Sequence, residues 1–307
     1  MKFLITGDLH SKKGLYWAVL SFLVFSFLFW LSGFLNFYFK YGFDYNSLFK
    51  YYFTDPEFPE RISLQQLSED FHINSFLYSF FYLMLSSLLA MTEVRYRLKV
   101  SIIILSALLC IAYLLSDFVI LFSESLVIYS KLYTFFGFQV ISGLMILMVL
   151  NHLIRGKTPG KRISLQKIII YVSTLLLSLF LVSTALIYFS KFGLSVSGIK
   201  EYFLGNPEKF KRAKTVSGVM KSFYPHLLTM ALFSFTLTHF AGFSANRRKI
   251  IVIIGVLLTI TFFMENLSSI LILFNGDFSY LKAVTFYLGV TLSIFLILSV
   301  FSLKKDS

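Results

Sequence analysis

Charged residues are scarce in this chain. Asp, Glu, Lys and Arg make up 14% of its 307 residues, whereas soluble domains carry about a quarter. The hydrophobic share is 57%, and the aromatic share is 19%. Apolar residues gather in blocks longer than about 18 residues, the length that a helix needs to cross a bilayer. This pattern excludes a soluble domain and predicts an all-α polytopic membrane protein, because a β-barrel would show alternating segments of about ten residues.

Cysteine and nucleotide-binding motifs are nearly absent. The single cysteine, Cys110, lies within an apolar block, so no intramolecular disulfide can form. The sequence has no Walker or Rossmann glycine pattern and no cluster of Cys or His at metal-ligand spacing. Soluble nucleotide chemistry is therefore not expected.

Acidic residues are outnumbered, with 15 Asp and Glu against 28 Lys and Arg, and the formal net charge is +13. In a soluble protein this balance would suggest nucleic acid as a partner. Here most basic residues fall in short segments between apolar blocks, where they act as topology signals. The expected partner is the lipid bilayer and not nucleic acid.

Eight apolar blocks predict eight transmembrane helices, and the N-terminal one is interpreted as a retained helix rather than a signal peptide, because no small-residue cleavage site follows it. The predicted spans are 15–38, 73–92, 100–122, 129–152, 166–190, 219–242, 250–274 and 281–303. With eight spans, the basic clusters before span one and after spans two, four, six and eight share one side. The positive-inside rule then places both termini in the cytoplasm.

The two long segments on the other, outer side resemble each other. "SLFKYYFTDPEFPER" at 47–61 parallels "SGIKEYFLGNPEKFKR" at 197–212, and "YFKYGF" at 38–43 parallels "YFSKFGL" at 188–194. The shared positions are Ser47 and Ser197, Lys50 and Lys200, Tyr52 and Tyr202, Phe53 and Phe203, Pro56 and Pro207, Glu57 and Glu208, and Arg61 and Arg212. The match predicts an internal duplication.

The duplication predicts two four-helix repeats, residues 1–155 with the outer segment 40–70 and residues 156–307 with the outer segment 191–218. Each copy has one span, a polar outer segment and three further spans. Because four is even, both copies enter the membrane from the same side. The repeats are thus parallel and related by a pseudo-twofold axis along the membrane normal. Short interfacial helices are expected in the outer segments.

Two histidines fall near the outer ends of equivalent spans. Aligning Phe71 with Phe223 sets His226 against Asn74 and leaves His72 two residues away in register. His72 and His226 could therefore face each other across the pseudo-axis, as the bis-histidine ligands of a single haem b do. The alternative is that both are solvated polar residues at helix ends.

Two acids lie within equivalent spans, in the predicted outer half. Asp117 belongs to the third span, and Glu265, followed by Asn266, belongs to the seventh. Ionisable groups inside a membrane are unfavourable and often mark function, although a place near the interface would let water solvate them. A carboxylate beside a histidine can carry protons, orient a ligating imidazole or bind a quinol hydroxyl. His72, Asn74, Asp117, His226, Glu265 and Asn266 together predict a polar site that faces outward.

The stretch "EYFLGNPEKFKR" followed by "YPHLLTMALFSFTLTHFAGF" resembles a family of poorly characterised bacterial inner-membrane proteins. That family has a Tyr-x-x-Gly segment and then a helix with Pro-His-Leu-x-x-Met, which here are Tyr202–Gly205 and Pro225–Met230. A second histidine commonly precedes the first by two residues, where this chain has Tyr224. The resemblance implies the bacterial inner (plasma) membrane and no established chemistry.

Three functions are compatible with these features. The first is a membrane subunit of a redox assembly that binds haem b or a quinol near the outer, periplasmic face and exchanges electrons with a protein partner there. The second is a transporter or permease in which Asp117 and Glu265 are coupling groups. The third is a non-catalytic anchor or scaffold whose outer segments bind a partner protein.

Overall fold

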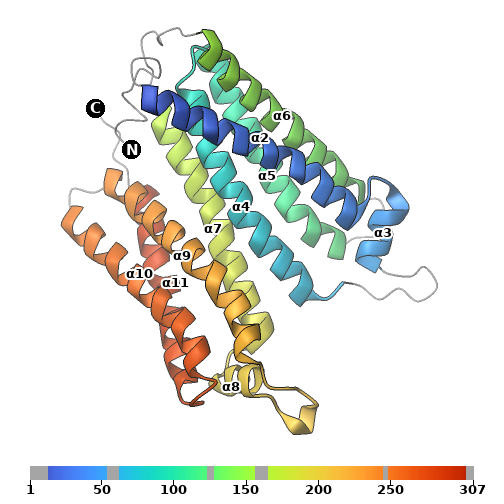
Figure 1. Cartoon of the computed structure of the whole chain (residues 1–307), viewed down its shortest axis with the longest axis vertical. Helices are drawn as coiled ribbons and strands as arrows, with labels where there is room; N and C mark the ends of the chain where they lie inside the picture. The colour runs from blue at the N-terminus through green and yellow to red at the C-terminus, as the bar shows by residue number, and fades with distance from the viewer. Residues whose placement is uncertain (1–12, 54–61, 123–127, 156–164, 245–247, 302–307) are drawn as a thin grey trace. The chain divides into compact units, whose positions relative to one another are not determined.

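The computed structural model describes residues 13–53, 62–122, 128–155, 165–244 and 248–301, and its regular elements are helices (Figure 1). The long helices are α2 (Lys13–Tyr41), α4 (Leu64–Ala90), α5 (Tyr96–Phe122), α6 (Ile128–Arg155), α7 (Gln166–Phe192), α9 (Val216–Ser244), α10 (Arg248–Leu271) and α11 (Phe278–Phe301). The short ones are α3 (Tyr45–Phe53), α8 (Val196–Leu204) and the 3₁₀ turn η2 (Pro207–Lys209).

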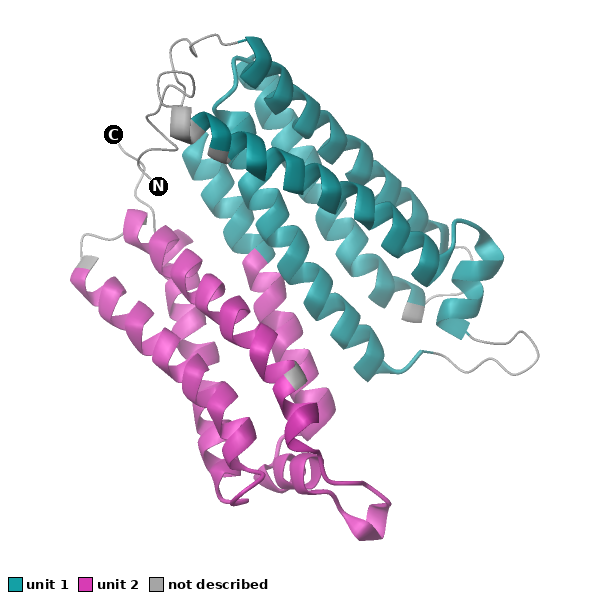
Figure 2. Ribbon diagram, in the orientation of Figure 1, with its two compact units in different colours: residues 1–176 teal, residues 177–307 magenta. Residues whose placement is uncertain are grey.

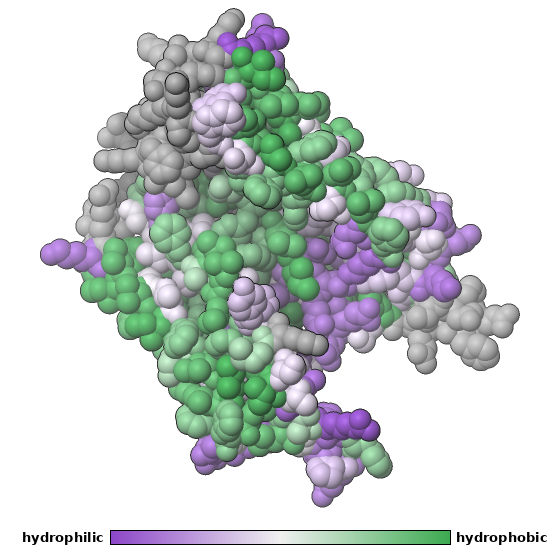
Figure 3. Space-filling model, viewed as in Figure 1, coloured by the Kyte–Doolittle hydropathy of each residue, from purple (hydrophilic) through white to green (hydrophobic). Residues whose placement is uncertain are grey.

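Eight helices in the described part of the chain are long and apolar enough to cross a membrane. Each overlaps one of the eight predicted spans, so the prediction of an all-helical, multi-pass membrane protein is confirmed. Apolar side chains cover much of the surface in the view of Figure 3, as expected of helices that contact lipid. The basic segments at 156–162, 246–247 and 304–305, on which the predicted orientation partly depends, lie outside the described residues.

One helix begins well before its predicted span. The second span was expected from residue 73, whereas α4 begins at Leu64. Its N-cap is Ser63, whose side chain accepts a hydrogen bond from the Gln66 N–H at 3.2 Å. The first turns are polar and gave no hydropathy signal, but a capped helix continues through polar residues once its buried face is packed.

The chain forms two compact units, residues 1–176 and 177–307, which divide within α7 (Figure 2). In unit 1, α6 packs against α5, α2 and α4, and α3 packs against α2 and α6. In unit 2, α9, α10 and α11 pack against one another and α8 packs against α11. The predicted repeat boundary at 155/156 borders the segment 156–164, outside the described residues, and stays a prediction.

Each unit has a glycine that ends its first long helix and turns the chain into a short one. Gly42 has φ +69° and Gly193 has φ +65°, a left-handed conformation that glycine adopts without a steric penalty. The next helix is then capped by a side chain two residues on. Asp44 accepts from the Ser47 N–H at 2.9 Å, and Ser195 accepts from the Gly198 N–H at 3.2 Å.

The helix bounds refine the register of the sequence match. α3 begins at Tyr45 and α8 at Val196, an interval of 151 residues, whereas the sequence match used 150 there. An interval of 151 would set Tyr52 against Phe203, whereas the sequence match sets it against Tyr202. The buried positions of the last helix follow the same interval: Lys131 and Lys282, Phe135 and Phe286, Ser142 and Ser293, Met145 and Leu296, and Val149 and Val300.

Candidate functional site: two buried ion pairs

The acid of unit 1 lies in a fully buried ion pair. The Asp117 carboxylate, on α5, is 2.7 Å from the Lys131 ammonium, on α6, and the two side chains are 2% and 0% exposed. Lys131 also donates to the Tyr113 carbonyl oxygen at 3.2 Å, and its Nζ lies 3.9 Å from the Tyr113 ring centroid. Opposite charges and the face of an aromatic ring both favour the ammonium here.

A short helix covers this ion pair. The Tyr52 hydroxyl, on α3, donates a hydrogen bond to Oδ1 of Asp117, the same oxygen that Lys131 approaches. Burial, reinforced by the negative charge of Asp117, raises the pKa of Tyr52 well above its ordinary value, so this hydroxyl keeps its proton. The Tyr41 ring lies parallel to Tyr52 with centroids 6.3 Å apart, and the Lys131 Nζ is 5.4 Å from the Tyr41 centroid.

A second ion pair in unit 1 lies closer to the surface. Lys40, on α2, and Asp70, on α4, are 2.5 Å apart and are 26% and 18% exposed. The Tyr51 hydroxyl donates to Asp70 at 2.5 Å. Burial and this bond raise the Tyr51 pKa. Tyr51 and Tyr52 are adjacent on α3, so one short helix contacts both carboxylates. Asp70 is thus a site residue that the sequence did not single out.

The acid of unit 2 also pairs with a lysine of the next helix. Lys282, on α11, donates to Oε1 of Glu265, on α10, and the side chains are 5% and 14% exposed. Its ammonium also donates to the Ser269 hydroxyl at 2.8 Å and to the Glu265 carbonyl oxygen at 3.3 Å. Three acceptors therefore serve the three N–H groups of Lys282.

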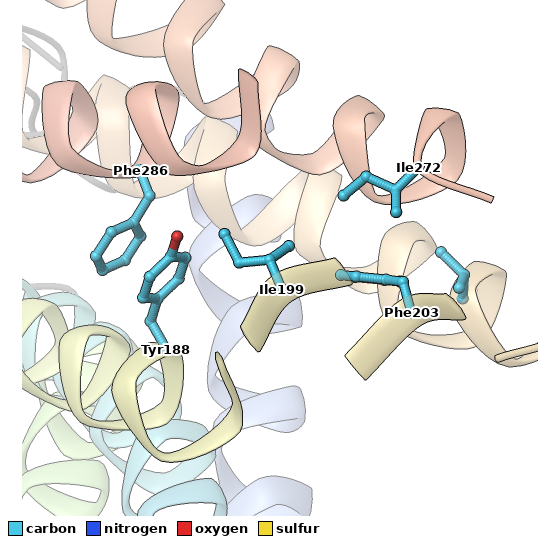
Figure 4. Packing of buried hydrophobic residues seen from close by; sticks show 6 residues of the cluster. Tyr188, Ile199, Phe203, Ile272 and Phe286 are labelled. Atoms are coloured by element: carbon cyan, nitrogen blue, oxygen red, sulfur yellow. The ribbon is translucent and has the colours of Figure 1, made fainter. Parts of the chain in front are cut away.

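Aromatic rings flank the Glu265 pair. The Lys282 Nζ is 5.6 Å from the Phe192 centroid and 5.8 Å from the Phe203 centroid. Figure 4 shows the adjoining apolar cluster, in which the rings of Tyr188 and Phe286 stack at 3.5 Å between α7 and α11. α8 contributes Phe203 and Ile199 to this cluster. The corresponding stack in unit 1 joins Phe37 of α2 to Phe135 of α6 at 4.0 Å.

The two predicted haem ligands lie in different units. His72, on α4 of unit 1, is buried, and its carbonyl oxygen accepts from the Ser75 hydroxyl at 3.0 Å. The His226 Nδ1, on α9 of unit 2, is 2.6 Å from the Ser222 carbonyl oxygen, one helical turn away in the same helix. That bond suits the Nδ1–H tautomer. The pairing of the two imidazoles stays a prediction.

The two predicted asparagines are placed differently. Asn74 is half-buried on α4. Asn266 is buried on α10, and its Nδ2 donates to the Phe262 carbonyl oxygen at 3.0 Å. That bond is within one helical turn, so it satisfies the amide without a partner from another helix. Among the described residues, no group of three or more His, Cys, Asp or Glu side chains is arranged to hold a metal ion.

Sequence reasoning singled out both intramembrane acids but missed both of their partners. Lys131 and Lys282 were treated as part of apolar spans. The signal that could have found them is a lysine one turn inside the fourth span of each proposed repeat, at an interval of 151 residues. A lysine at that depth requires an anion, and each preceding span contains one acid.

Eight apolar helices that bury two acid–lysine pairs define a multi-pass membrane protein. The transmembrane helical domain family Aq_1264_TM matches residues 42–160 and 193–306, more than half of the chain, and the chain belongs to that family. No curated protein and no solved structure matches it. The matched ranges begin at residues 42 and 193, again an interval of 151.

Proposed function

We propose that the chain is a transport protein of the bacterial inner membrane, with Asp117 and Glu265 as its coupling groups. The observation that carries the proposal is the pair of buried acid–lysine contacts, one in each unit. Buried ion pairs stabilise a protein little relative to apolar side chains of similar volume, because desolvation offsets their attraction. Charges kept at two such places in a membrane protein are typical of groups that exchange partners during transport.

The proposal includes a duplicated architecture, with two parallel four-helix repeats and the short helices α3 and α8 on the outer side. Its support is the interval of 151 residues, which recurs in the left-handed glycines, in the bounds of α3 and α8, in the buried lysines and in the family match. Both termini are then cytoplasmic, and the α3 and α8 ends of the units face the periplasm.

Transport is tested by solute flux into proteoliposomes that contain the purified protein. Radiolabelled amino acids, sugars, organic acids or inorganic anions are added outside, and at least one solute should accumulate faster than in protein-free vesicles. Asp117→Asn and Glu265→Gln should reduce that flux by tenfold or more, whereas Tyr280→Phe, at an exposed position on α11, should not. Wild-type protein that transports no solute class contradicts the proposal.

A second candidate function is a membrane subunit of a redox assembly that binds haem b or a quinol. The buried position of His72 favours this function, because buried imidazoles are good haem ligands. The His72 carbonyl oxygen accepts a hydrogen bond from the Ser75 hydroxyl. In this scheme His72 and His226 ligate haem iron, while Asp117, Glu265, Asn74 and Asn266 line the site. Electrons would pass to a protein partner at the outer face.

An absorption spectrum of the purified protein tests the redox function, together with solvent extraction of bound quinone. A haem should give a Soret band that is lost in His72→Ala and in His226→Ala. Protein that shows neither a Soret band nor an extractable quinone contradicts this candidate and leaves transport as the proposal.

A further inference from the structure

The two buried lysines differ in how fully their N–H groups are satisfied. Lys282 donates to three oxygens, from the Glu265 side chain and main chain and from Ser269. Lys131 has two oxygen acceptors, the Asp117 carboxylate and the Tyr113 carbonyl oxygen. Its Nζ also lies over the aromatic rings of Tyr113 and Tyr41. An ammonium has three N–H donors, so two oxygen acceptors leave one N–H of Lys131 without an oxygen partner among the described residues.

The aromatic residues near the two lysines also differ, since those near Lys131 carry hydroxyl groups and those near Lys282 do not. The ring near Lys131 that corresponds to Phe192 of unit 2 is Tyr41, and the one that corresponds to Phe203 is Tyr52. The Tyr41 hydroxyl is buried and has no hydrogen-bond partner in the described part of the chain. A buried hydroxyl without a partner is unfavourable, and a ligand oxygen or an anion beside Lys131 would satisfy it.

Unit 2 also has a buried tyrosine hydroxyl that lacks a partner among the described residues, that of Tyr188. Tyr188 corresponds to Phe37, one helical turn from the position of Tyr41. Its hydroxyl is not accompanied by an ammonium with spare capacity, because Lys282 already has three acceptors. The combination of a spare N–H and an unsatisfied hydroxyl is therefore a property of unit 1.

Unit 1 also connects its buried acid to the surface. Lys40 and Asp70 are partly exposed, Tyr51 bonds Asp70, and the adjacent Tyr52 bonds Asp117. The Tyr41 and Tyr51 rings are 4.6 Å apart. These two hydroxyl–carboxylate pairs lie on one short helix, so a partly exposed acid and the buried acid are brought to the same element. When Phe71 is aligned with Phe223, Asp70 corresponds to Ser222 of unit 2, which has no carboxyl group to take up a proton.

We infer that the ion pair of unit 1 binds a small monovalent anion together with one proton. The anion accepts hydrogen bonds from the Lys131 ammonium and the Tyr41 hydroxyl, and Asp117 accepts the proton. The net charge stays at zero: a carboxylate and an ammonium become a carboxylic acid, an ammonium and an anion. This inference rests on the proposed transport function and names its substrate class and its coupling ion.

Charge balance requires that the two ligands bind together. A proton alone on Asp117 would leave the buried Lys131 ammonium without a counter-ion, and an anion alone would place two negative charges beside one ammonium. Both states are strongly disfavoured in a buried site. The groups around the Asp117 carboxylate come from every element packed against it: Lys40, Tyr41, Tyr51, Tyr52, Asp70, Tyr113 and Lys131.

Proton uptake by the full chain in detergent tests the inference. A weakly buffered sample near neutral pH receives sodium chloride, sodium nitrate or sodium formate, and a pH electrode records protons taken up. At least one of the salts should cause saturable uptake approaching about one proton per chain, because binding of the anion and the proton is linked. Asp117→Asn should abolish the uptake, and Asp277→Asn, at an exposed acid between α10 and α11, should retain it.

Tyr41→Phe and Phe192→Tyr form a matched pair that avoids removing a charge. Tyr41→Phe should weaken anion binding, so that the salt concentration at half-maximal proton uptake rises at least fivefold. Phe192→Tyr should leave that concentration unchanged. Wild-type protein without uptake in all three salts overturns the inference, as does uptake that persists in Asp117→Asn. Proton uptake in detergent without any solute flux into proteoliposomes would contradict the transport function and retain the anion site. Solute flux without anion-linked proton uptake would contradict the site alone.

Discussion

The acid–lysine pairs of units 1 and 2 occupy corresponding helices but have different surroundings. In unit 1 the Asp117–Lys131 pair is bounded by tyrosines, and one of them, Tyr52, reaches the carboxylate from a surface helix. In unit 2 the corresponding rings are Phe192 and Phe203, and Lys282 is satisfied by its own acid and a serine. Both pairs join consecutive helices, but among the described residues a tyrosine hydroxyl is bonded to the acid in unit 1 only. Anion binding is therefore expected beside Asp117, while Glu265 is a coupling group of the proposed transport cycle without an anion site of its own.

Removing one lysine should have the largest effect on stability. Lys131→Met leaves the Asp117 carboxylate buried without a counter-ion, and it should lower the free energy of unfolding by about 3–5 kcal/mol. Lys282→Met should lower it less, because Glu265 is 14% exposed and Asp117 only 2%. Unfolding in mixed micelles with increasing SDS measures both.

The matched control is the double variant Asp117→Leu with Lys131→Met. Removing both charges restores an apolar contact, so most of the lost stability should return. A double variant as unstable as Lys131→Met would show that the pair itself, and not the unpaired charge, holds α5 and α6 together.

The hydrogen bond from Tyr52 should contribute the next largest effect. Tyr52→Phe deletes a donor to a charged acceptor and should lower the free energy of unfolding by about 1.5–3 kcal/mol. The reciprocal change in unit 2, Phe203→Tyr, should bring no gain, since Lys282 already approaches Glu265. Thermal unfolding in detergent compares the variants. If Tyr52→Phe loses the same stability in an Asp117→Asn background, the two groups are not coupled.

The two left-handed glycines offer a smaller contrast. Gly193→Ala should destabilise by roughly 1–2 kcal/mol through its backbone conformation alone, because an added Cβ meets no atom within 4 Å. Gly42→Ala should destabilise more, since its Cβ would lie 2.4 Å from the Ser47 Cβ. SDS unfolding ranks the two variants. Equal losses would mean that α3 shifts freely to accommodate the methyl group.

The smallest effect concerns the loop after α8, which has no counterpart among the described residues of unit 1. Lys211 forms an ion pair with Glu201, Lys209 donates a hydrogen bond to it, and both lower the pKa of its carboxyl group. A depressed carboxyl pKa means that the contact is fully present above the ordinary Glu pKa and is lost as the pH falls through the lowered pKa of Glu201. A spin label on Phe210→Cys, in a Cys110→Ser background, should become more mobile there. In a Glu201→Gln background the label should be mobile at every pH. Label mobility that still depends on pH in that background would show that Glu201 is not the titrating group.

The architecture was more accessible from the sequence than the site. Long apolar blocks predicted the eight spans because hydropathy reports burial in lipid directly. Residues 64–72 were missed as helix, since their turns are polar and depend on the cap at Ser63 and on packing. Asp117 and Glu265 stood out as acids in apolar spans.

Their partners did not stand out. Lys131 and Lys282 lie near helix ends. Lysine side chains there usually extend toward the headgroups, so their presence does not predict a buried site. Only the packing of α5 on α6, and of α10 on α11, turns them inward. The hydrogen bond from Tyr52 to Asp117 could not be inferred either, because the match between the two outer segments says nothing of contacts between α3 and α5. Contacts between elements distant in sequence, such as Tyr52 with Asp117, follow from tertiary structure and leave no local pattern.

The separation of each acid from its lysine by a single loop bears on how the protein enters the bilayer. A lone Asp or Lys within a span is inserted at a penalty, which is about 2.5–3.5 kcal/mol at the helix centre and smaller toward the ends. Asp117 and Lys131 are on consecutive helices, so neutralisation becomes available as soon as the second emerges from the ribosome. We expect α5–α6 and α10–α11 to leave the translocon as helical hairpins, in each of which the intramembrane acid and lysine already neutralise each other, rather than one helix at a time.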